Sequence, residues 1–253
     1  MNTIGLYTFV AREIQRLTRV YVQTILSPII NAVLYILIFG FVVGSRIGDF
    51  GGVSYIQFVL PGVLMLNLIG SAFSHSSSSL YMGRWGKSIE ELLVAPLSYL
   101  EMIIGYVVSG VIRGLIVAAG IYIVAILFGA ATVTHAGLFL FYTIAVAVIF
   151  SLLGLLVGLW ANNFEQLTVL NTFVITPLTF LGGVFNSITM MPEKIQWIVR
   201  LNPFFYFVDG LRYSMIGIHE ANTLVGLGII SGLIVGLGGL AWYLFSIGWK
   251  LRV

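Results

Sequence analysis

A histidine inside a run of serines is the part of this chain that most resembles a catalytic group. His75 lies between Ser74 and the run Ser76 to Ser79, in a stretch that is otherwise apolar. Intramembrane serine hydrolysis needs a serine at a glycine-rich helix start, facing a histidine on another helix. Here the histidine and the serines share one segment. We therefore interpret the run as the wet, small-residue end of a membrane helix and expect no hydrolase.

A second sequence pattern resembles the end of a phosphate-binding loop. The tripeptide Gly86-Lys87-Ser88 would need a glycine at position 81, which is Tyr81, and a preceding strand. No ATP site or cofactor is expected in this chain, so an ATP-driven process would require an ATPase on another polypeptide. His135 and His219 lack partners for a metal site, and no cysteine is present.

The composition is that of a membrane protein. Of the 253 residues, 59% are hydrophobic and 8% are charged, whereas a soluble chain carries about a quarter charged residues. We predict one polytopic domain over 1–253, with no separate soluble domain. The first twenty residues contain arginines but no apolar core, so no cleavable signal is expected. No basic run is long enough to predict nucleic-acid binding.

The apolar runs predict an all-α membrane protein with six spans, because a crossing needs about 20 residues. With the N-terminus inside, seven Lys and Arg residues lie on cytoplasmic segments and four on outside segments. This difference favours cytoplasmic N- and C-termini. The expected spans are 22–44, 55–77, 102–127, 136–160, 167–186 and 222–247.

Residues 4–21 predict an amphipathic helix that lies in the membrane interface. Apolar residues recur at helical spacing, and three arginines repeat that spacing on another face. The apolar side would enter the acyl boundary and the arginines would lie near lipid phosphates. Such a helix either anchors the topology alone or also touches a cytoplasmic partner. The apolar residues are Val10, Ile14, Leu17 and Tyr21, and the basic ones are Arg12, Arg16 and Arg19.

The segment 88–96 predicts a short, rigid cytoplasmic helix. Ser88-Ile89-Glu90-Glu91 has the pattern of a capping box, and Ser98-Tyr99-Leu100-Glu101 repeats it at the start of the third span. Pro96 ends the helix after two turns. A stiff turn can carry a displacement from a soluble motor, although it also fits a plain interhelical turn. The next cytoplasmic loop carries Glu165, either a lesser contact or a polar turn.

The region 187–220 predicts a re-entrant hairpin. A helix from Pro192 to Leu201 would be roughly 15 Å long, about half the hydrocarbon thickness. Asn202-Pro203 stops it, because the residue before a proline is disfavoured in helical geometry. A second apolar helix over 203–218 would complete the hairpin.

Polar residues inside the spans form stripes. Arg113 falls near mid-membrane, where a charge must face protein or water. It either holds an anionic substrate group or pairs within the bundle. For the other stripes, interhelical hydrogen bonds are a more common explanation than a solute pathway. They comprise Thr24, Ser27, Asn31 and Tyr35 in the first span, Asn67 and Ser71 in the second, and Thr168, Thr172, Thr176 and Thr179 in the fifth.

Glycines spaced four residues apart predict faces where helices pack closely within the chain. This pattern occurs as Gly110-Gly114 in the third span, Gly154-Gly158 in the fourth, and Gly228, Gly232 and Gly236 in the last.

Three motifs together resemble the type-2 ABC exporter permeases, and within them the YadH-type inner-membrane permeases of bacteria. They are the segments 44–49, 90–96 and 177–185, the last ending in Gly-Gly-x-Phe. The resemblance implies a homodimer bound to two copies of a separate ATPase, which binds ATP and Mg²⁺. Membrane lipids would be its other partners and the bacterial inner membrane its location. The expected cargo is amphipathic, lipid-linked, glycan or drug-like.

The resemblance also assigns roles to residues. It implies a coupling helix at Ser88, Glu90, Glu91, Leu92, Leu93, Ala95 and Pro96, with Glu165 as a lesser contact, and hairpin positions at Gly182, Gly183, Pro192, Asn202, Pro203 and Arg212. It places the first, second and fifth spans along the route, which makes a solute path as well supported as interhelical hydrogen bonding. The residues of that path would be Asn31, Tyr35, Asn67, Ser71, Arg113, Thr172 and Thr176. The alternative is an ATP-independent transporter or channel, which should show intramembrane acids or inverted repeats. We find neither in the sequence.

Overall fold

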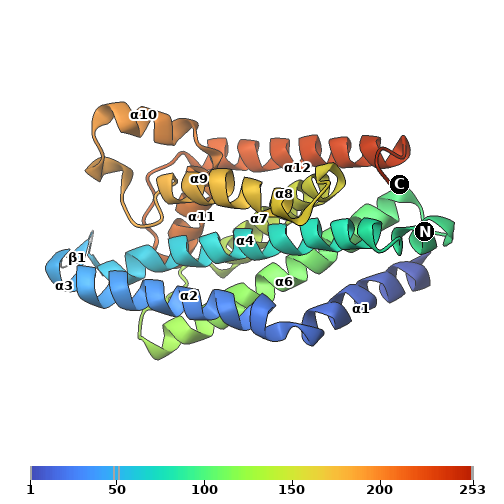
Figure 1. Cartoon of the computed structure of the whole chain (residues 1–253). Helices are drawn as coiled ribbons and strands as arrows, with labels where there is room; N and C mark the ends of the chain where they lie inside the picture. The colour runs from blue at the N-terminus through green and yellow to red at the C-terminus, as the bar shows by residue number, and fades with distance from the viewer. Residues whose placement is uncertain (1, 48, 51, 252–253) are drawn as a thin grey trace.

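The computed structural model describes residues 2–47, 49–50 and 52–251, and it forms a bundle of long helices (Figure 1). Within these described residues, six helices are long and apolar enough to cross a membrane. The second extends to Trp85, beyond the expected residue 77, and the fifth ends at Leu181, before the expected residue 186. The six are Val22–Arg46, Tyr55–Trp85, Tyr99–Leu127, Ala136–Trp160, Phe164–Leu181 and Thr223–Ser246.

The first and fifth spans contain π-helical turns. In the first span, π-segments Val22–Leu26 and Ile36–Val43 flank α2 (Ser27–Tyr35) and precede α3 (Gly44–Ile47). In the fifth, a π-segment at Asn171–Ile175 separates α8 (Phe164–Leu170) from α9 (Thr176–Leu181). The other helices are α1 (Thr3–Arg19), α4 (Tyr55–Trp85), α5 (Ile89–Val94), α6 (Tyr99–Leu127), α7 (Ala136–Trp160), α10 (Glu193–Leu201), α11 (Pro203–Ile216) and α12 (Thr223–Ser246), with a 3₁₀ turn at Ile188–Met190.

The helix α4 is the centre of the bundle. Most of it is buried, and α6, α7 and α11 pack against it. The spans containing α2, α9 and α12 have few buried residues. Figure 1 shows α2 and α9 on opposite sides of α4. The bundle thus has a buried core and an outer set of spans with free surface.

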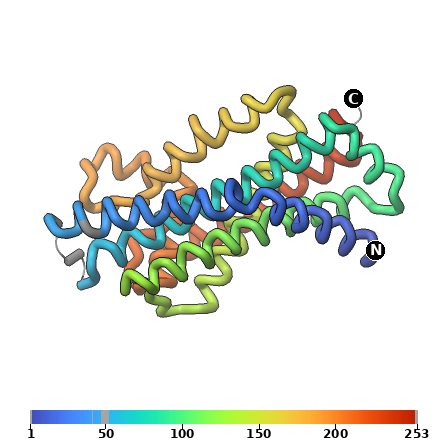
Figure 2. The backbone as a smooth tube through the Cα atoms, turned by 60° about the horizontal axis from the view of Figure 1, so that its bottom comes forward, coloured from blue at the N-terminus to red at the C-terminus, as the bar shows by residue number. Residues whose placement is uncertain are grey.

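The connections gather at the two ends of the bundle. Both termini, α5 and the 161–163 turn lie at one end (Figures 1 and 2). At the other end lie α10, α11 and a short antiparallel pair, β1 (Asp49–Phe50) with β2 (Val53–Ser54). This pair is a small departure from the all-α expectation.

Glycines let α7 approach α4 at backbone distance. A Cβ on Gly154 would lie 2.4 Å from the carbonyl oxygen of Phe73, and one on Gly158 would lie 2.7 Å from that of Ser77. On α6, a Cβ on Gly110 would lie 2.5 Å from the hydroxyl of Ser76. The close packing expected at these glycines is present.

The three glycines spaced four residues apart in the last span do not pack against the described part of the chain. A Cβ on Gly228, Gly232 or Gly236 would meet none of the described residues within 4 Å. The expectation of intramolecular packing was therefore wrong for α12. This helix turns another face to the bundle, with Ile230 and Phe245 buried, and spacing alone cannot say which face a neighbour covers.

We expect Gly154→Ala to destabilise the protein by about 1–3 kcal/mol, because its methyl group would overlap the backbone of α4. Gly232→Ala is the control, since its methyl group enters open space and alanine is the better helix former. Unfolding followed by tryptophan fluorescence in mild detergent measures the difference. Equal midpoint temperatures for the two variants would contradict the packing argument.

Candidate functional site

A polar cavity of about 290 Å³ lies between α2, α4, α6 and the fifth span. Residues that are far apart in the sequence line it, and several of them belong to the polar stripes described above. The cavity is lined by six of the seven residues expected along a path, namely Asn31, Tyr35, Asn67, Ser71, Arg113 and Thr176.

The seventh expected path residue, Thr172, is exposed and does not line the cavity. Its neighbour Asn171 does, together with Ile175. The π-segment Asn171–Ile175 explains the change, because a wider turn rotates the side chains relative to an α-helix. A stripe counted at α-helical spacing therefore includes Thr172, although Asn171 is the residue that lines the cavity.

Arg113 lies midway along α6 and faces this cavity. Its Nε atom is buried without a hydrogen-bond partner. Among the residues that the structure describes, the guanidinium makes no hydrogen bond or ion pair. The described residues therefore contain no hydrogen-bond or ion-pair partner that would explain an arginine in the middle of a span.

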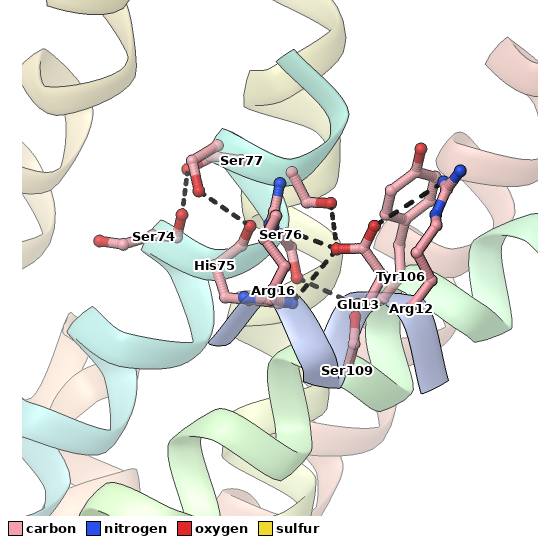
Figure 3. A network of polar contacts seen from close by, with 11 residues as sticks. Arg12, Glu13, Arg16, Ser74, His75, Ser76, Ser77, Tyr106 and Ser109 are labelled. Carbon is pink, nitrogen blue, oxygen red and sulfur yellow. Dashed lines mark hydrogen bonds and ion pairs between the residues drawn. The ribbon is translucent and has the colours of Figure 1, made fainter. Parts of the chain in front are cut away.

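A buried carboxylate on α1 forms a second polar centre (Figure 3). Glu13 is 5% exposed, accepts a hydrogen bond from the Ser79 hydroxyl, and lies 3.2 Å from Arg16 Nη2. His75 Nε2 is 3.7 Å from the same carboxylate. The network ties α1 to α4. The sequence analysis missed Glu13, although its spacing of four from Phe9 and Leu17 places it on their buried face.

The serine run is not the wet helix end that we expected. The helix continues to Trp85, and His75, Ser76, Ser77 and Ser79 are each at most 3% exposed. The small side chains permit the close approach of α6 and α7. A serine hydroxyl also supplies its own hydrogen bond, and that of Ser76 donates to the Tyr106 carbonyl oxygen at 3.4 Å.

A second cavity, of about 300 Å³, lies beside Glu13 at the end of the bundle that carries the termini. Its lining includes all three expected interfacial residues, Arg12, Arg16 and Arg19. Ser88 and Tyr106 also line it. The arginines of α1 therefore face a pocket next to the start of α5.

The short helix expected over 88–96 is α5. Its Ile89 and Leu92 are buried, whereas Glu90, Glu91 and Val94 are exposed. Leu93 and Ala95 are partly buried, and the helix ends before Pro96 as expected. One face of α5 is therefore held by the bundle while its acidic face is free.

The two expected capping boxes differ in outcome. The second is confirmed, because Ser98 Oγ accepts from the Glu101 backbone and Glu101 accepts from the Ser98 N–H. The first was wrong, since Ser88 has helical backbone angles and makes no side-chain cap. A capping side chain needs an extended backbone to reach the first turn. The backbone N–H of Asn2 also donates to Glu101, which joins the start of α1 to the start of α6.

The loop between α7 and α8, which the sequence analysis expected on the cytoplasmic side, is held from two sides. Arg84 Nη1 donates to the carbonyl oxygens of Gly158 and Leu159, at 2.9 and 2.8 Å. Lys250 Nζ donates to the Trp160 carbonyl oxygen at 2.9 Å. Glu165 follows this loop in the first turn of α8 and is exposed.

The helices of the predicted hairpin have the expected breaks. Pro192 precedes α10, and Pro203 begins α11. The Asn202 side chain donates to the Leu178 carbonyl oxygen at 2.6 Å, which fixes this break to α9. Just after the C-terminal end of α9, Gly183 takes a positive φ of 88°, which glycine adopts freely.

Arg212 of α11 acts as a structural clamp. It is 0% exposed, and it donates to the carbonyl oxygens of Phe58 and Gly183. Its guanidinium also lies 4.0 Å from the centre of the Phe58 ring. Gly182 allows the neighbouring contact, because a Cβ there would be 3.0 Å from the Phe204 backbone.

Comparison with known proteins decides the family. Residues 5–216 match the family described as ABC-2 type transporter. The chain belongs to this family. It is 42% identical to the inner membrane transport permease YadH of Escherichia coli K12 over 251 residues, covering 98% of this chain and 97% of YadH. The expected resemblance is confirmed.

More distant relatives agree with this assignment. The chain is 27% identical to nodulation protein J of Rhizobium leguminosarum bv. viciae over 84% of this chain and 82% of that protein. For nodulation protein J of Rhizobium meliloti, the values are 24%, 85% and 80%. This ABC-2 chain is thus a multi-pass membrane transport permease, and family membership implies association with an ABC ATPase subunit.

We expect Glu13→Ala to destabilise the permease by about 1–3 kcal/mol, because it leaves Ser79 and Arg16 without their buried partner. Hydrogen exchange in α1 should also become faster. The control is Arg19→Ala, an exposed change on the same helix. If both variants unfold and exchange alike, Glu13 does not hold α1 to the bundle.

Proposed function

We propose that this permease is the transmembrane subunit of an ATP-driven exporter. It would work as a homodimer with two copies of a separate ATPase, with both termini in the cytoplasm. The cargo would be an amphipathic, lipid-linked, glycan or drug-like compound. The main support is α5, which offers two free carboxylates, Glu90 and Glu91, on a helix whose other face is fixed.

A displacement of α5 would reach the cavity by two connected routes. Through Ser98 and Glu101 it would move α6, which carries Arg113. Through Asn2, whose side chain donates to the Pro96 carbonyl oxygen at 3.3 Å, it would move α1. Because Glu13 joins α1 to α4, the second route also ends at a helix that lines the cavity.

A homodimer would also cover polar side chains that otherwise face the lipid. Asn31 and Thr172 are exposed at the middle of the first and fifth spans. Polar side chains that face hydrocarbon are unfavourable, and a second copy would cover them. The cavity lies between these two spans, so a dimer interface there would place it at the centre of the assembly.

Reversing the charge of α5 should uncouple the permease. We expect Glu90→Lys with Glu91→Lys to abolish co-purification of the ATPase and to remove ATP-dependent transport, with an unchanged unfolding temperature because both side chains are exposed. Glu193→Lys, exposed at the opposite end, is the control. Retention of the ATPase and of transport in the double variant would refute the coupling role. Solute movement by the permease alone in liposomes would favour an ATP-independent transporter.

The proposed interface can be mapped by cross-linking, since the chain has no cysteine of its own. Phe173→Cys, at a residue 74% exposed in the fifth span, should form a disulfide-linked dimer in native membranes. Val235→Cys, at a residue 73% exposed on α12, is the control and should form no disulfide between the two copies. Equal cross-linking at both positions, read from non-reducing gels, would reject the interface.

A further inference from the structure

Arg113 differs from the fully buried charged side chains of the bundle. Glu13, Glu101, Asp209 and Arg212 all have hydrogen-bond partners. Arg113 is partly buried at the middle of α6, and no hydrogen bond or ion pair reaches it within residues 2–47, 49–50 and 52–251. An arginine at mid-span costs about 2.5–3.5 kcal/mol on insertion scales. This cost is expected to be offset by a function that uses the charge.

The surroundings of Arg113 suit an anion. Of the described residues, no aspartate or glutamate lines its cavity. The lining instead contains the amides of Asn31 and Asn67 and the hydroxyls of Tyr35 and Ser71. These groups can donate hydrogen bonds to an anion while the guanidinium supplies the charge. They come from α2 and α4, so the donors surround the cavity from several directions.

We propose that this cavity binds the phosphate group of an anionic amphiphile, with Arg113 as its counter-ion. A guanidinium can donate two parallel hydrogen bonds to phosphate oxygens, which makes it a strong phosphate ligand. Donors on several helices match a tetrahedral group better than a planar carboxylate. The inference rests on the proposed function, in which the cavity lies on the export route, and it narrows the class of cargo.

The first span offers an apolar surface for a tail attached to the phosphate. Ile30 and Leu34 of α2 are exposed and apolar, and α2 also lines the cavity. At about 290 Å³, the cavity has room for a headgroup but not for a whole amphiphile. A tail would therefore extend along α2 while the phosphate stays at Arg113.

The test measures binding of radiolabelled hexadecyl phosphate to the full-length permease in phosphatidylcholine nanodiscs, without the ATPase. We expect saturable binding that weakens about tenfold or more in Arg113→Gln, because a charged, bidentate contact is lost. Arg200→Gln, on exposed α10, is the matched control and should bind as the unchanged protein does. Equal binding by both variants would overturn the proposal.

Two further arms keep the test decisive. Asn67→Asp preserves shape but places a carboxylate in the cavity, so it should also weaken binding about tenfold or more. Unchanged binding in this variant would overturn the proposal even if Arg113→Gln failed to fold. Should neither variant fold, saturable binding of hexadecanol as tight as that of hexadecyl phosphate would overturn it.

Inorganic phosphate separates the two sources of the anion. We expect it to compete at least tenfold more weakly than unlabelled hexadecyl phosphate. Equal competition would show that the site binds free phosphate, and it would exclude an anionic amphiphile as the specific ligand of this cavity. Because this assay needs neither ATPase nor transport, its failure is distinct from failure of the exporter proposal, which the α5 variants test.

Discussion

A lipid bilayer offers no water to an unpaired polar group, and this constraint governs the polar contacts of the bundle. Buried polar side chains here serve as ties between helices. Asn202 joins the start of α11 to α9, and Arg212 joins α11 to α4. Glu13 joins α1 to α4. The elements that are not full spans thus owe their placement to hydrogen bonds as much as to apolar packing.

A steric constraint acts together with the electrostatic one. Gly154 and Gly158 bring α7 against the backbone of α4, so these two helices cannot slide without overlap. The first and fifth spans have no comparable burial. Relative movement is therefore easier at the surface where α2 and α9 flank α4. This is also the surface that carries the polar cavity.

The sequence predicted the features that depend on local signals. The spans followed from apolar length, and the breaks at Pro192 and Asn202-Pro203 from backbone chemistry, because both act within a few residues. Features that depend on a neighbour were missed or wrong. Spacing alone did not reveal that Gly232 faces open space. The burial of Glu13 was missed because its charge suggested an exposed side chain, although its spacing from Phe9 and Leu17 places it on their buried face. Several of the polar stripes converged on one cavity because each was a helical face, and the π-turn displaced one member.

The Glu13 network connects the α5 region to the polar cavity that contains Arg113. His75 of this network follows Ser74, which lines the cavity, so the two polar centres meet within one turn of α4. On the opposite side, α4 is fixed to α7 by the glycines. In the proposed exporter, a force on α5 that reaches α1 would therefore act on the side of α4 that does not contact α7. We expect the cavity to respond by movement of the first span relative to α4, because the α7 side has no room to yield.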